Sequence, residues 1–392
     1  MDLFAKCYAP SLADEYREKG IYPYFRALES RQGPEVVMEG KRRIMLGSNN
    51  YLGLTSCPEV VEAGVRALEE FGTGCSGSRF LNGTLTMHLE LEAELARFLR
   101  KEAVMTFSTG FQSNLGIISA LVGHSDYMIL DRENHASIYD GTRLSFGRML
   151  RYRHSDMADL ERCLRQVPET AGALIITDGV FSMGGDIADL PSIVRLAKQY
   201  GARVMVDDAH GLGTIGEGGR GTASYFGLEK EVDVYMGTFS KSLASLGGYM
   251  AADARIVDYV RHNSRPFIFS ASIPPASCAT ALAALRHLER HPELPQRLSD
   301  LGDHFRTALK DRGLVIRESQ TPIVPIFTYQ AERTLVVAEK LYENGVYVNT
   351  VLPPAAPSDG CMLRTSLMAT HRSALLDEAA DVIQKVLEAN HV

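Results

Sequence analysis

The stretch ALIITDGVFSMGGDIADLPSIVRLAKQYGARVMVDD at residues 173–208 decides the fold class, because it reads as a strand, a helix and a second strand. Two short apolar runs, ALIITD and ARVMVDD, flank LPSIVRLAKQYG, whose apolar residues recur at helical spacing. Similar apolar runs, AVMTFS, DYMIL and VDVYMG, recur between about residues 100 and 250. This alternation predicts βαβ units and a mostly parallel sheet covered by helices. Ligands of such sheets bind beyond the carboxyl ends of the strands.

The pattern changes on both sides of this region. After Pro274 come longer amphipathic helices, then short strands near PIVPIFTY, VYVNTV and CMLRTSLM, and a last helix from about His371. We therefore expect an N-terminal arm at 1–45, a large domain at 46–273 and a smaller α+β domain at 274–392. Two lobes also suit the length, since single cores seldom grow past roughly 250–300 residues. The arm should join the small lobe or a partner subunit.

Composition narrows the class of protein. The chain is 45% hydrophobic and 23% charged and has no low-complexity block, as is typical of a soluble globular protein. The formal charge of −7 is modest and Lys and Arg are dispersed, so no nucleic-acid partner is indicated. The first residues lack the apolar core of a signal peptide, and no uninterrupted apolar stretch of about 18 residues follows. We expect a cytoplasmic protein.

Six cysteines are scattered without CxxC or short Cys/His spacing, which argues against a zinc site and against a disulfide framework. We expect small, buried hydrophobic side chains in a reducing compartment. The six are Cys7, Cys57, Cys75, Cys163, Cys278 and Cys361.

The segment VDVYMGTFSKSLASLGG places Lys241 just after a strand, beside the hydroxyl residues Thr238 and Ser240. Desolvation in this apolar stretch would lower the pKa of the amine and make it a better nucleophile toward an aldehyde. The two hydroxyls can donate hydrogen bonds to a phosphate. Taken alone, a lysine at a strand end is more often structural, so other motifs must decide.

The segment ARVMVDDAHG ends a buried strand on Asp207, Asp208 and His210. A carboxylate in this position is costly unless it meets a cation, and a pyridinium nitrogen is such a partner. We assign that role to Asp207, with His210 supporting the carboxylate or the ring oxygen. The alternative is a metal pair, but no further ligands cluster nearby in the sequence, so we expect no metal.

The segment FSTGFQSN follows a strand and opens a helix. Backbone N–H groups of Gly110 and Phe111, helped by Ser108 or Ser113, can face an anion at the positive helix end. Helix capping alone would explain the same turn.

Two more strand ends carry polar residues. In DRENHASIYDG, His135 can stack on a pyridine ring or cap a helix, and both readings stay open. In TDGVFSMGGD, Asp178 and Ser182 follow a strand, and Ser182 can hydrogen-bond a ring hydroxyl. Because such residues converge at one edge of a parallel sheet, their combination is stronger evidence than any single member.

Two arginines have alternative roles. Arg364, in the apolar strand CMLRTSLM, can clamp a substrate carboxylate through its fork of N–H donors, or it can form an interlobe salt bridge. Arg26 can act on a substrate in the same way, but solvation of the arm is the interpretation we favour.

Together these residues resemble the α-oxoamine synthase family of fold-type I enzymes that depend on pyridoxal 5'-phosphate (PLP). The resemblance implies a large domain with a mostly parallel, seven-stranded sheet, a smaller α+β C-terminal domain, and a homodimer with shared sites at the subunit interface. The motifs follow the family order over nearly the whole chain: SNNYLGL at 48–54, NHASIYDG at 134–141, DDAHGLG at 207–213, GTFSKS at 237–242 and RTSLMATH at 364–371.

Carried onto matching positions, the resemblance implies roles around the cofactor. Lys241 is the Schiff-base lysine, and Asp207 is the partner of the pyridine nitrogen. His135 stacks on the ring and orients the substrate. Thr238 and Ser240 bind the phosphate.

The resemblance also implies residues for the substrate and for the second subunit. Asn50 and Arg364 match positions that handle the amino-acid carboxylate. Ser270 and Ser272, in FIFSASIPP, match a segment that reaches the neighbouring subunit's phosphate.

Within the family, the motifs YPYFR, GTGCSGSRFLNGT, FSTGFQSN and GTFSKSLASLGG are similar to a bacterial branch that uses L-serine. Glycine-using and alanine-using branches typically read GTLGKA where this chain has Ser240 before the lysine. The implied reaction is the decarboxylative condensation of L-serine with a long-chain acyl-CoA, or an acyl carrier protein thioester, to 3-ketosphinganine. The alternatives are 8-amino-7-oxononanoate synthase, 2-amino-3-ketobutyrate CoA ligase, 5-aminolevulinate synthase or a non-catalytic lipid-binding partner subunit. The acyl substrate also leaves peripheral membrane contact open.

Overall fold

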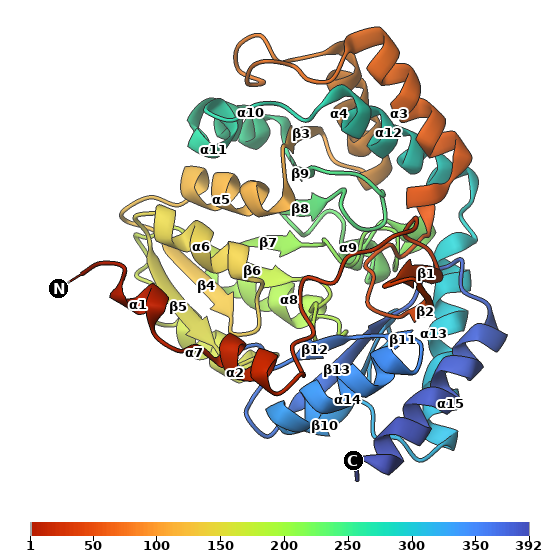
Figure 1. The fold of residues 1–392 in the computed structure, drawn as a ribbon. Helices are drawn as coiled ribbons and strands as arrows, with labels where there is room; N and C mark the ends of the chain where they lie inside the picture. Colours follow the sequence, from red (N-terminus) through yellow and green to blue (C-terminus); the bar gives the residue numbers. More distant parts are fainter. Residues whose placement is uncertain (1, 392) are drawn as a thin grey trace.

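The computed structural model describes residues 2–391 and is organised around a seven-stranded sheet (Figure 1). The strand order is β3-β9-β8-β7-β6-β4-β5. Among the described strands of this sheet β9 alone runs antiparallel to its neighbours, so the prediction of a mostly parallel sheet is confirmed. The strands are β3 (Ala103–Phe107), β4 (Tyr127–Asp131), β5 (Arg148–Tyr152), β6 (Ala173–Asp178), β7 (Arg203–Asp207), β8 (Val234–Thr238) and β9 (Gly248–Ala252).

Both faces of this sheet are buried under helices. Along β6, Leu174 and Ile176 pack in one hydrophobic layer and Ile175 packs in the opposite one, because successive side chains of a strand alternate. Burial on both faces explains the continuous apolar runs in the sequence. The first layer holds α5 (Gly110–Leu121), α6 (Ala136–Leu144), α10 (Ala254–Asn263) and α11 (Arg265–Ile268). The second holds α3 (Pro58–Phe71), α4 (Thr86–Leu99), α7 (Met157–Leu164), α8 (Leu190–Tyr200), α9 (Thr222–Tyr225) and α12 (Pro275–Arg290).

A second core lies in the C-terminal part of the chain, as expected for a smaller α+β lobe. The antiparallel strands β10 (Ile323–Tyr329), β13 (Cys361–Ser366) and β12 (Asn349–Val351) form its sheet. Three amphipathic helices pack their apolar faces into this core around Leu298, Phe305, Leu341 and Leu376. They are α13 (Leu294–Asp311), α14 (Ala331–Glu343) and α15 (Ser373–Ala389).

The N-terminal segment contributes to this lobe. Strand β2 (Lys41–Met45) pairs with β1 (Glu35–Met38) and runs parallel to β11 (Val346–Tyr347). The short helices α1 (Ala5–Tyr8) and α2 (Leu12–Glu18) have no buried residues and lie at one side of the molecule (Figure 1). The short 3-10 helices are η1 (Leu54–Ser56) and η2 (Glu217–Gly219). Within residues 2–391, no helix combines the length and the apolar character needed to cross a bilayer.

Packing suggests a different boundary between the lobes. Helix α12 packs on α3 and α4, and its Cys278 and Leu285 belong to the core of the large sheet. The change to amphipathic helices in the sequence predicts a boundary at Pro274. The amphipathic pattern of a helix does not reveal, however, which lobe its apolar face packs against. We therefore propose a boundary near residue 291 rather than between 273 and 274, with residues 35–45 counted in the small lobe.

Candidate active site

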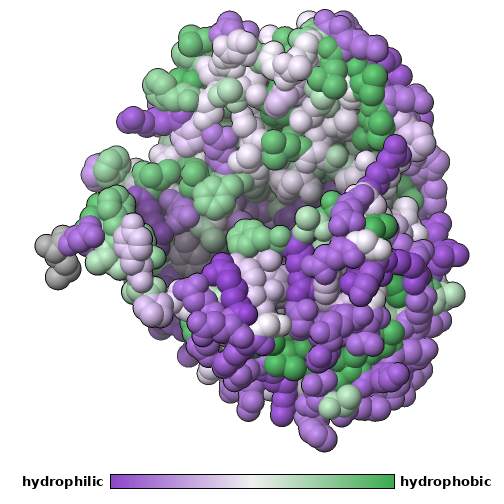
Figure 2. Space-filling model, in the orientation of Figure 1, coloured by the Kyte–Doolittle hydropathy of each residue, from purple (hydrophilic) through white to green (hydrophobic). Residues whose placement is uncertain are grey.

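Two adjoining cavities, of about 280 and 400 Å³, lie at the carboxyl end of the large sheet. They share His135, His210 and Lys241. The register sets Asp178 opposite Asp207, so the last residues of β6 and β7 lie at one level. Figure 2 shows a recess near the centre of one face of the molecule. The polar strand ends thus converge at one edge of the sheet, as predicted.

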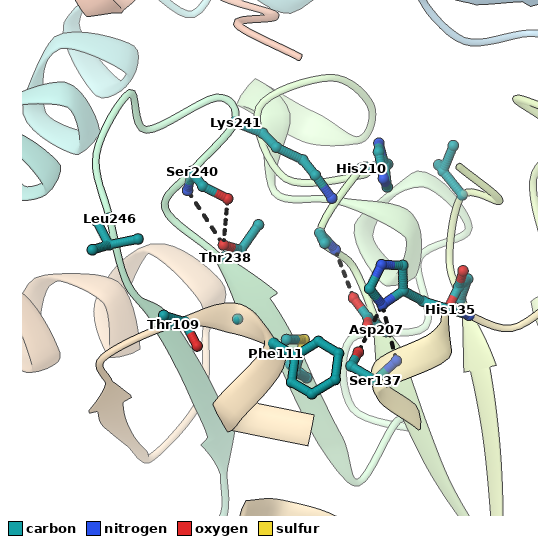
Figure 3. A pocket seen from close by; sticks show the side chains of 15 residues that line it. Thr109, Phe111, His135, Ser137, Asp207, His210, Thr238, Ser240, Lys241 and Leu246 are labelled. Carbon is teal, nitrogen blue, oxygen red and sulfur yellow. Dashed lines mark hydrogen bonds between the residues drawn. The ribbon is translucent and has the colours of Figure 1, made fainter. Parts of the chain in front are cut away.

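Lys241 follows β8, and its side chain extends into the space beside His210 and Asp207 (Figure 3). Burial lowers the pKa of its amine from the ordinary 10.5 to about 8, although the Asp207 charge raises it. Among residues 2–391 the amine has no hydrogen-bonding partner that would hold its proton. A partly neutral, unpartnered amine in a cavity is a nucleophile for a carbonyl group.

The two adjacent carboxylates at the end of β7 have different surroundings. Asp207 lines the first cavity, and its Oδ2 accepts a hydrogen bond from Nδ2 of Asn114 at 2.7 Å. Asp208 accepts instead from the backbone N–H and the hydroxyl of Thr222, at 2.8 and 2.6 Å, and burial raises its pKa to about 6. Only Asp207 of the pair can meet a ligand. Residues 2–391 contain no group of three or more His, Cys, Asp or Glu suited to a metal ion.

Asp178 is a second buried carboxyl group beside Asp207. Burial and the nearby Asp207 charge raise its pKa well above the ordinary value, which favours its protonated form. Its Oδ1 accepts the backbone N–H of His135 at 3.3 Å. Asp207, which lines the cavity, is therefore the better partner of the two for a cation in the cavity.

His135 caps α6, which confirms one of the two alternatives left by the sequence; it also lines both cavities, and its stacking on a ring stays a prediction (Figure 3). Its Nδ1 accepts the backbone N–H of Ser137 at 3.3 Å and lies 2.7 Å from the Ser137 hydroxyl. Burial lowers the pKa of His135; the Asp207 charge opposes this shift and the Lys241 charge adds to it. A neutral ring that accepts at Nδ1 carries its proton on Nε2.

The start of α5 and the end of β8 form a site suited to an anion. Thr109 caps the helix, and the N–H groups of Gly110 and Phe111 have no partner among the described residues. The hydroxyls of Thr238 and Ser240 lie 2.9 Å apart on the other side (Figure 3). A Cβ at position 110 would come within 2.8 Å of the Thr238 side chain, so this close approach requires glycine. Free N–H groups, hydroxyls and a helix N-terminus together suit a phosphate.

Arg364 lies at the floor of the second cavity and is almost fully buried. Its donors bind Asn49 Oδ1 at 3.0 Å, the Tyr51 hydroxyl at 3.3 Å, Ser366 Oγ at 2.6 Å and the carbonyl oxygen of Ser182 at 2.5 Å. Within residues 2–391, no carboxylate neutralises it. A buried cation held by neutral groups at a cavity wall is suited to an anionic ligand rather than to an interlobe salt bridge.

The sequence model for class I and II aminotransferases matches residues 41–383. The chain belongs to the aminotransferase class I and II family.

Several characterised members of this family are similar over nearly the whole chain. The chain is 50% identical to the serine palmitoyltransferase of Sphingobacterium spiritivorum, covering 96% of this chain and 95% of that protein. It is 42% identical to the 8-amino-7-oxononanoate synthase of Thermoanaerobacter pseudethanolicus, covering 95% of each. A serine palmitoyltransferase of S. paucimobilis, solved with a bound PLP–myriocin aldimine, is 37% identical with a TM-score of 0.96 over 100% of both chains. These relatives confirm the α-oxoamine synthase group and the fold-type I architecture.

The cavities of this family member bring together most of the residues predicted from the sequence. Two predicted serines lie elsewhere: Ser270 Oγ accepts from Gln112 at 2.5 Å, and Ser272 Oγ donates to the carbonyl oxygen of Gly83 at 2.6 Å. Their role toward a neighbouring subunit stays a prediction. The predicted residues that line the cavities are Gly110, Phe111, His135, Asp178, Ser182, Asp207, His210, Thr238, Ser240, Lys241 and Arg364.

The structure places one predicted substrate residue, Asn50, outside both cavities. Asn50 does not line either cavity, because its Nδ2 donates to Thr55 Oγ1 at 2.8 Å. Its neighbour Asn49 lines the second cavity and accepts from Arg364. The chain turns irregularly here, so adjacent side chains point to different places without the alternation of a strand. Asn49 therefore replaces Asn50 in our proposal.

Other polar residues differ from expectation. Ser108 Oγ donates to the carbonyl oxygen of Ala271, and Ser113 Oγ to that of Thr109, so neither supports the anion site. Arg26 does not merely solvate the arm. It pairs with Glu339 and its guanidinium lies 3.6 Å from the centre of the Tyr342 ring, which fixes the arm to α14. Of the cysteines, Cys163, Cys278 and Cys361 are buried, Cys57 and Cys75 are partly buried and Cys7 is exposed.

Sequence reasoning did not assign Thr109, Asn49, Tyr51, Asn114 and Ser137. Asn114 follows Gly110 by four residues, so the two lie on the same face of α5, and this spacing was a usable signal. Tyr51 lies inside the motif SNNYLGL, but nothing in the local pattern shows that its hydroxyl reaches the cavity residues.

Proposed function

We propose that this enzyme condenses L-serine with a long-chain acyl-CoA, palmitoyl-CoA, to form 3-ketosphinganine, CO2 and free CoA. This is the first step of sphingolipid biosynthesis. The observation that carries the proposal is the unpartnered amine of Lys241, placed between the Asp207 carboxylate and an anion site. The 50% identity to a serine palmitoyltransferase supports the choice of L-serine and of the long acyl group.

The residues present fit PLP as the cofactor. The close approach that Gly110 allows leaves its N–H, that of Phe111 and the Thr238 and Ser240 hydroxyls to hold the phosphate. When bound, PLP supplies an aldehyde that Lys241 can capture covalently and a ring that stabilises a carbanion.

Other cavity residues would hold the pyridine ring. Asp207, which lines the cavity, would face the ring nitrogen and keep it protonated. His135 would stack on one face of the ring. His210 and the Ser182 hydroxyl would lie near the ring oxygen.

Arg364 and Asn49 would bind the carboxylate of L-serine at the second cavity. Arg364 is a buried cation without a carboxylate partner among the described residues, and Asn49 holds one of its terminal nitrogens at 3.0 Å. This fixed position would orient the amino acid so that its Cα faces Lys241, which lines the same cavity.

Proton transfer would fall to Lys241 and His135. With a pKa of about 8, a sizeable fraction of the Lys241 amine is neutral near neutral pH and can take the Cα proton of serine at Nζ. His135 carries its proton on Nε2 and can donate it in a hydrogen bond to the acyl carbonyl oxygen as negative charge develops there.

The enzyme would work as a homodimer with shared active sites in the cytoplasm. Ser270 and Ser272 would reach the phosphate of the neighbouring subunit's cofactor. Large apolar side chains near the first cavity are exposed, including Phe111, Leu246 and Phe269, with Phe269 at 78% exposure. Exposed apolar groups of this kind are typical of a subunit contact.

The test is a visible absorbance titration of the PLP-loaded protein with L-serine, glycine and L-alanine in separate samples, followed by product analysis with palmitoyl-CoA. Of the three amino acids, we expect only L-serine to shift the visible absorption band of the PLP-loaded protein. We expect 3-ketosphinganine to form when palmitoyl-CoA is added. A shift with L-alanine only, and an 8-amino-7-oxononanoate-type product with a shorter acyl-CoA, would assign the protein to the other branch found among its relatives. Absence of any band after PLP addition would support a non-catalytic subunit.

A further inference from the structure

Asn114 connects Asp207 to His135 through a continuous chain of hydrogen bonds. It lies on α5, and its side chain is fully buried. One hydrogen of Nδ2 goes to Asp207 Oδ2 at 2.7 Å, and the other goes to Ser137 Oγ at 2.8 Å. The Ser137 hydroxyl in turn lies 2.7 Å from Nδ1 of His135, and Figure 3 shows the side chains of Asp207, Ser137 and His135 close together.

Only one arrangement of hydrogens satisfies this chain. A reversed Asn114 amide would place Oδ1 against the Asp207 carboxylate, with no hydrogen between the two oxygens. Because the amide donates to Ser137 Oγ, the hydroxyl hydrogen of Ser137 is free to point at Nδ1 of His135. The backbone N–H of Ser137 also donates to that nitrogen. His135 therefore keeps its proton on Nε2.

This arrangement has a cost. The Oδ1 atom of Asn114 is buried and has no hydrogen-bond partner among the described residues. An unsatisfied buried carbonyl costs about 1–3 kcal/mol. An apolar side chain of similar size would fill the same space without that cost, so packing alone does not explain asparagine here. Unsatisfied groups of this kind are typical of functional sites.

We propose that Asn114 is a positioning residue that holds the Asp207 carboxylate toward the cofactor's ring nitrogen and keeps the His135 proton on Nε2. The inference rests on the proposed function for the identity of the cofactor. One amide side chain thus acts both on Asp207, which would keep the ring nitrogen protonated, and on His135, which would face the acyl group.

Three variants test this role. Asn114→Leu removes both donors at similar volume, and Asn114→Asp keeps the shape but replaces the donor with a carboxyl group. Ser119→Ala is the matched control, because it lies on the same helix and its hydroxyl donates to the carbonyl oxygen of Leu115. The measurements are the PLP dissociation constant of the apoprotein, the proton position on His135 by ¹⁵N NMR of histidine-labelled protein, and kcat and KM for L-serine.

For Asn114→Leu we expect PLP binding to weaken by about tenfold and His135 to become a mixture of its two neutral forms. We expect kcat to fall by about 10- to 100-fold while KM for L-serine changes less than about threefold. Ser119→Ala should match the wild type in all three. If PLP affinity and the His135 proton position in Asn114→Leu match those of Ser119→Ala, the proposal is wrong.

If Asn114→Leu does not fold, Asn114→Asp still tests whether position 114 must donate a hydrogen bond to Asp207. Near neutral pH its carboxylate would face that of Asp207 and weaken PLP binding. Toward about pH 5 the new carboxyl group would take up a proton and donate to Asp207, so PLP affinity relative to the wild type should recover. The titratable groups around Asp207 are Asp178 from β6, Asp208 after β7, His135 from α6, Lys241 after β8 and Tyr249 from β9. All of them, including Asp208 with its pKa of about 6, are present in both proteins, so their effects cancel in the ratio of the two PLP affinities.

If the PLP affinity of Asn114→Asp relative to the wild type does not change with pH, the proposal is wrong, because protonation of the new carboxyl group cannot restore lost packing. PLP affinity and the His135 proton position are measured without L-serine or acyl-CoA. Failure of the proposed condensation would leave both readouts intact, so the two failures can be told apart.

Discussion

The Tyr51 hydroxyl lies 2.7 Å from Nδ1 of His210 and 3.3 Å from Nη2 of Arg364. Because arginine only donates, the hydroxyl accepts from Arg364, and its own hydrogen can go to Nδ1 of His210 or, at 3.4 Å, to Oδ1 of Asn49. Burial raises the pKa of Tyr51; burial and the charges of Lys241 and Arg364 lower that of His210 well below its ordinary value. Both groups are therefore neutral. One hydroxyl joins the proposed carboxylate clamp to a residue beside the proposed cofactor ring.

Replacing this hydroxyl should weaken the clamp. In Tyr51→Phe, Arg364 loses one of its acceptors and Nδ1 of His210 is left without a partner. The loss of a hydrogen bond worth about 1–1.5 kcal/mol should raise KM for L-serine roughly tenfold. Steady-state kinetics with saturating acyl-CoA measures it. The control is Tyr235→Phe, whose hydroxyl donates to the backbone of Glu229; an equal KM in both variants would contradict the role.

Lys241→Ala should abolish the visible band that depends on the lysine, and condensation should fall by at least about 10³-fold, because both the covalent attachment and the proton acceptor are lost. Lys101→Ala is the matched control. Burial lowers the pKa of Lys101 as well, but its Nζ donates to the backbone of Val232. It should keep the band and the activity. Retention of the band in Lys241→Ala would show that another amine captures PLP.

The pKa of Lys241 predicts how the apoprotein takes up PLP. Only the neutral amine attacks the aldehyde, so the rate should rise with pH and level off above about 8, rather than above the ordinary 10.5. Because the Asp207 charge raises this pKa, Asp207→Asn should shift the midpoint to lower pH. Stopped-flow absorbance between pH 6 and about 10 measures both profiles. A wild-type rate that still rises steeply at about pH 10, as expected for an amine with the ordinary pKa of 10.5, would contradict the desolvation of Lys241.

The polar residues at the strand ends could be predicted because strand topology fixes where they meet. Once the apolar runs indicate parallel strands, Asp178, Asp207 and the segment before Lys241 must lie at one edge of the sheet. No knowledge of the packing is needed for that step. The α-oxoamine synthase motifs then predicted the cofactor, and the residue roles that they imply stay predictions.

Sequence analysis could not predict side-chain directions or packing partners where no helical or strand periodicity fixes them. Asn49 and Asn50 differ by one residue in an irregular turn, and only the folded backbone shows which of them meets Arg364. The apolar face of α12 is visible in the sequence, but its partners α3 and α4 precede it by some 200 residues. Ser137 contributes through its hydroxyl to a ring two residues away, which its sequence position alone does not reveal.

The last prediction concerns His154, which joins Asp131 at the end of β4 to Asp186 in the loop that carries Ser182. Its ring nitrogens lie 2.9 and 2.8 Å from the two carboxylates. Burial disfavours the charged ring, but these hydrogen bonds and charges raise the pKa of His154 to about 10. The ordinary value is 6.5. The stabilisation is therefore complete below about pH 6.5 and is lost as pH rises through about 10.

His154→Gln should lower the free energy of unfolding by about 3 kcal/mol at pH 6, because it leaves the buried Asp131 carboxylate without its cation and leaves Asp186 with Arg317 alone, at 3.0 Å. The difference from the wild type should shrink steadily between about pH 6.5 and 10. Urea denaturation at fixed protein concentration measures it, with His262→Gln as the control, since that histidine forms an exposed pair with Asp258. A difference that stays constant over this range would exclude the charge as the cause and would point to lost packing of the ring against Phe181, 4.5 Å away between ring centres.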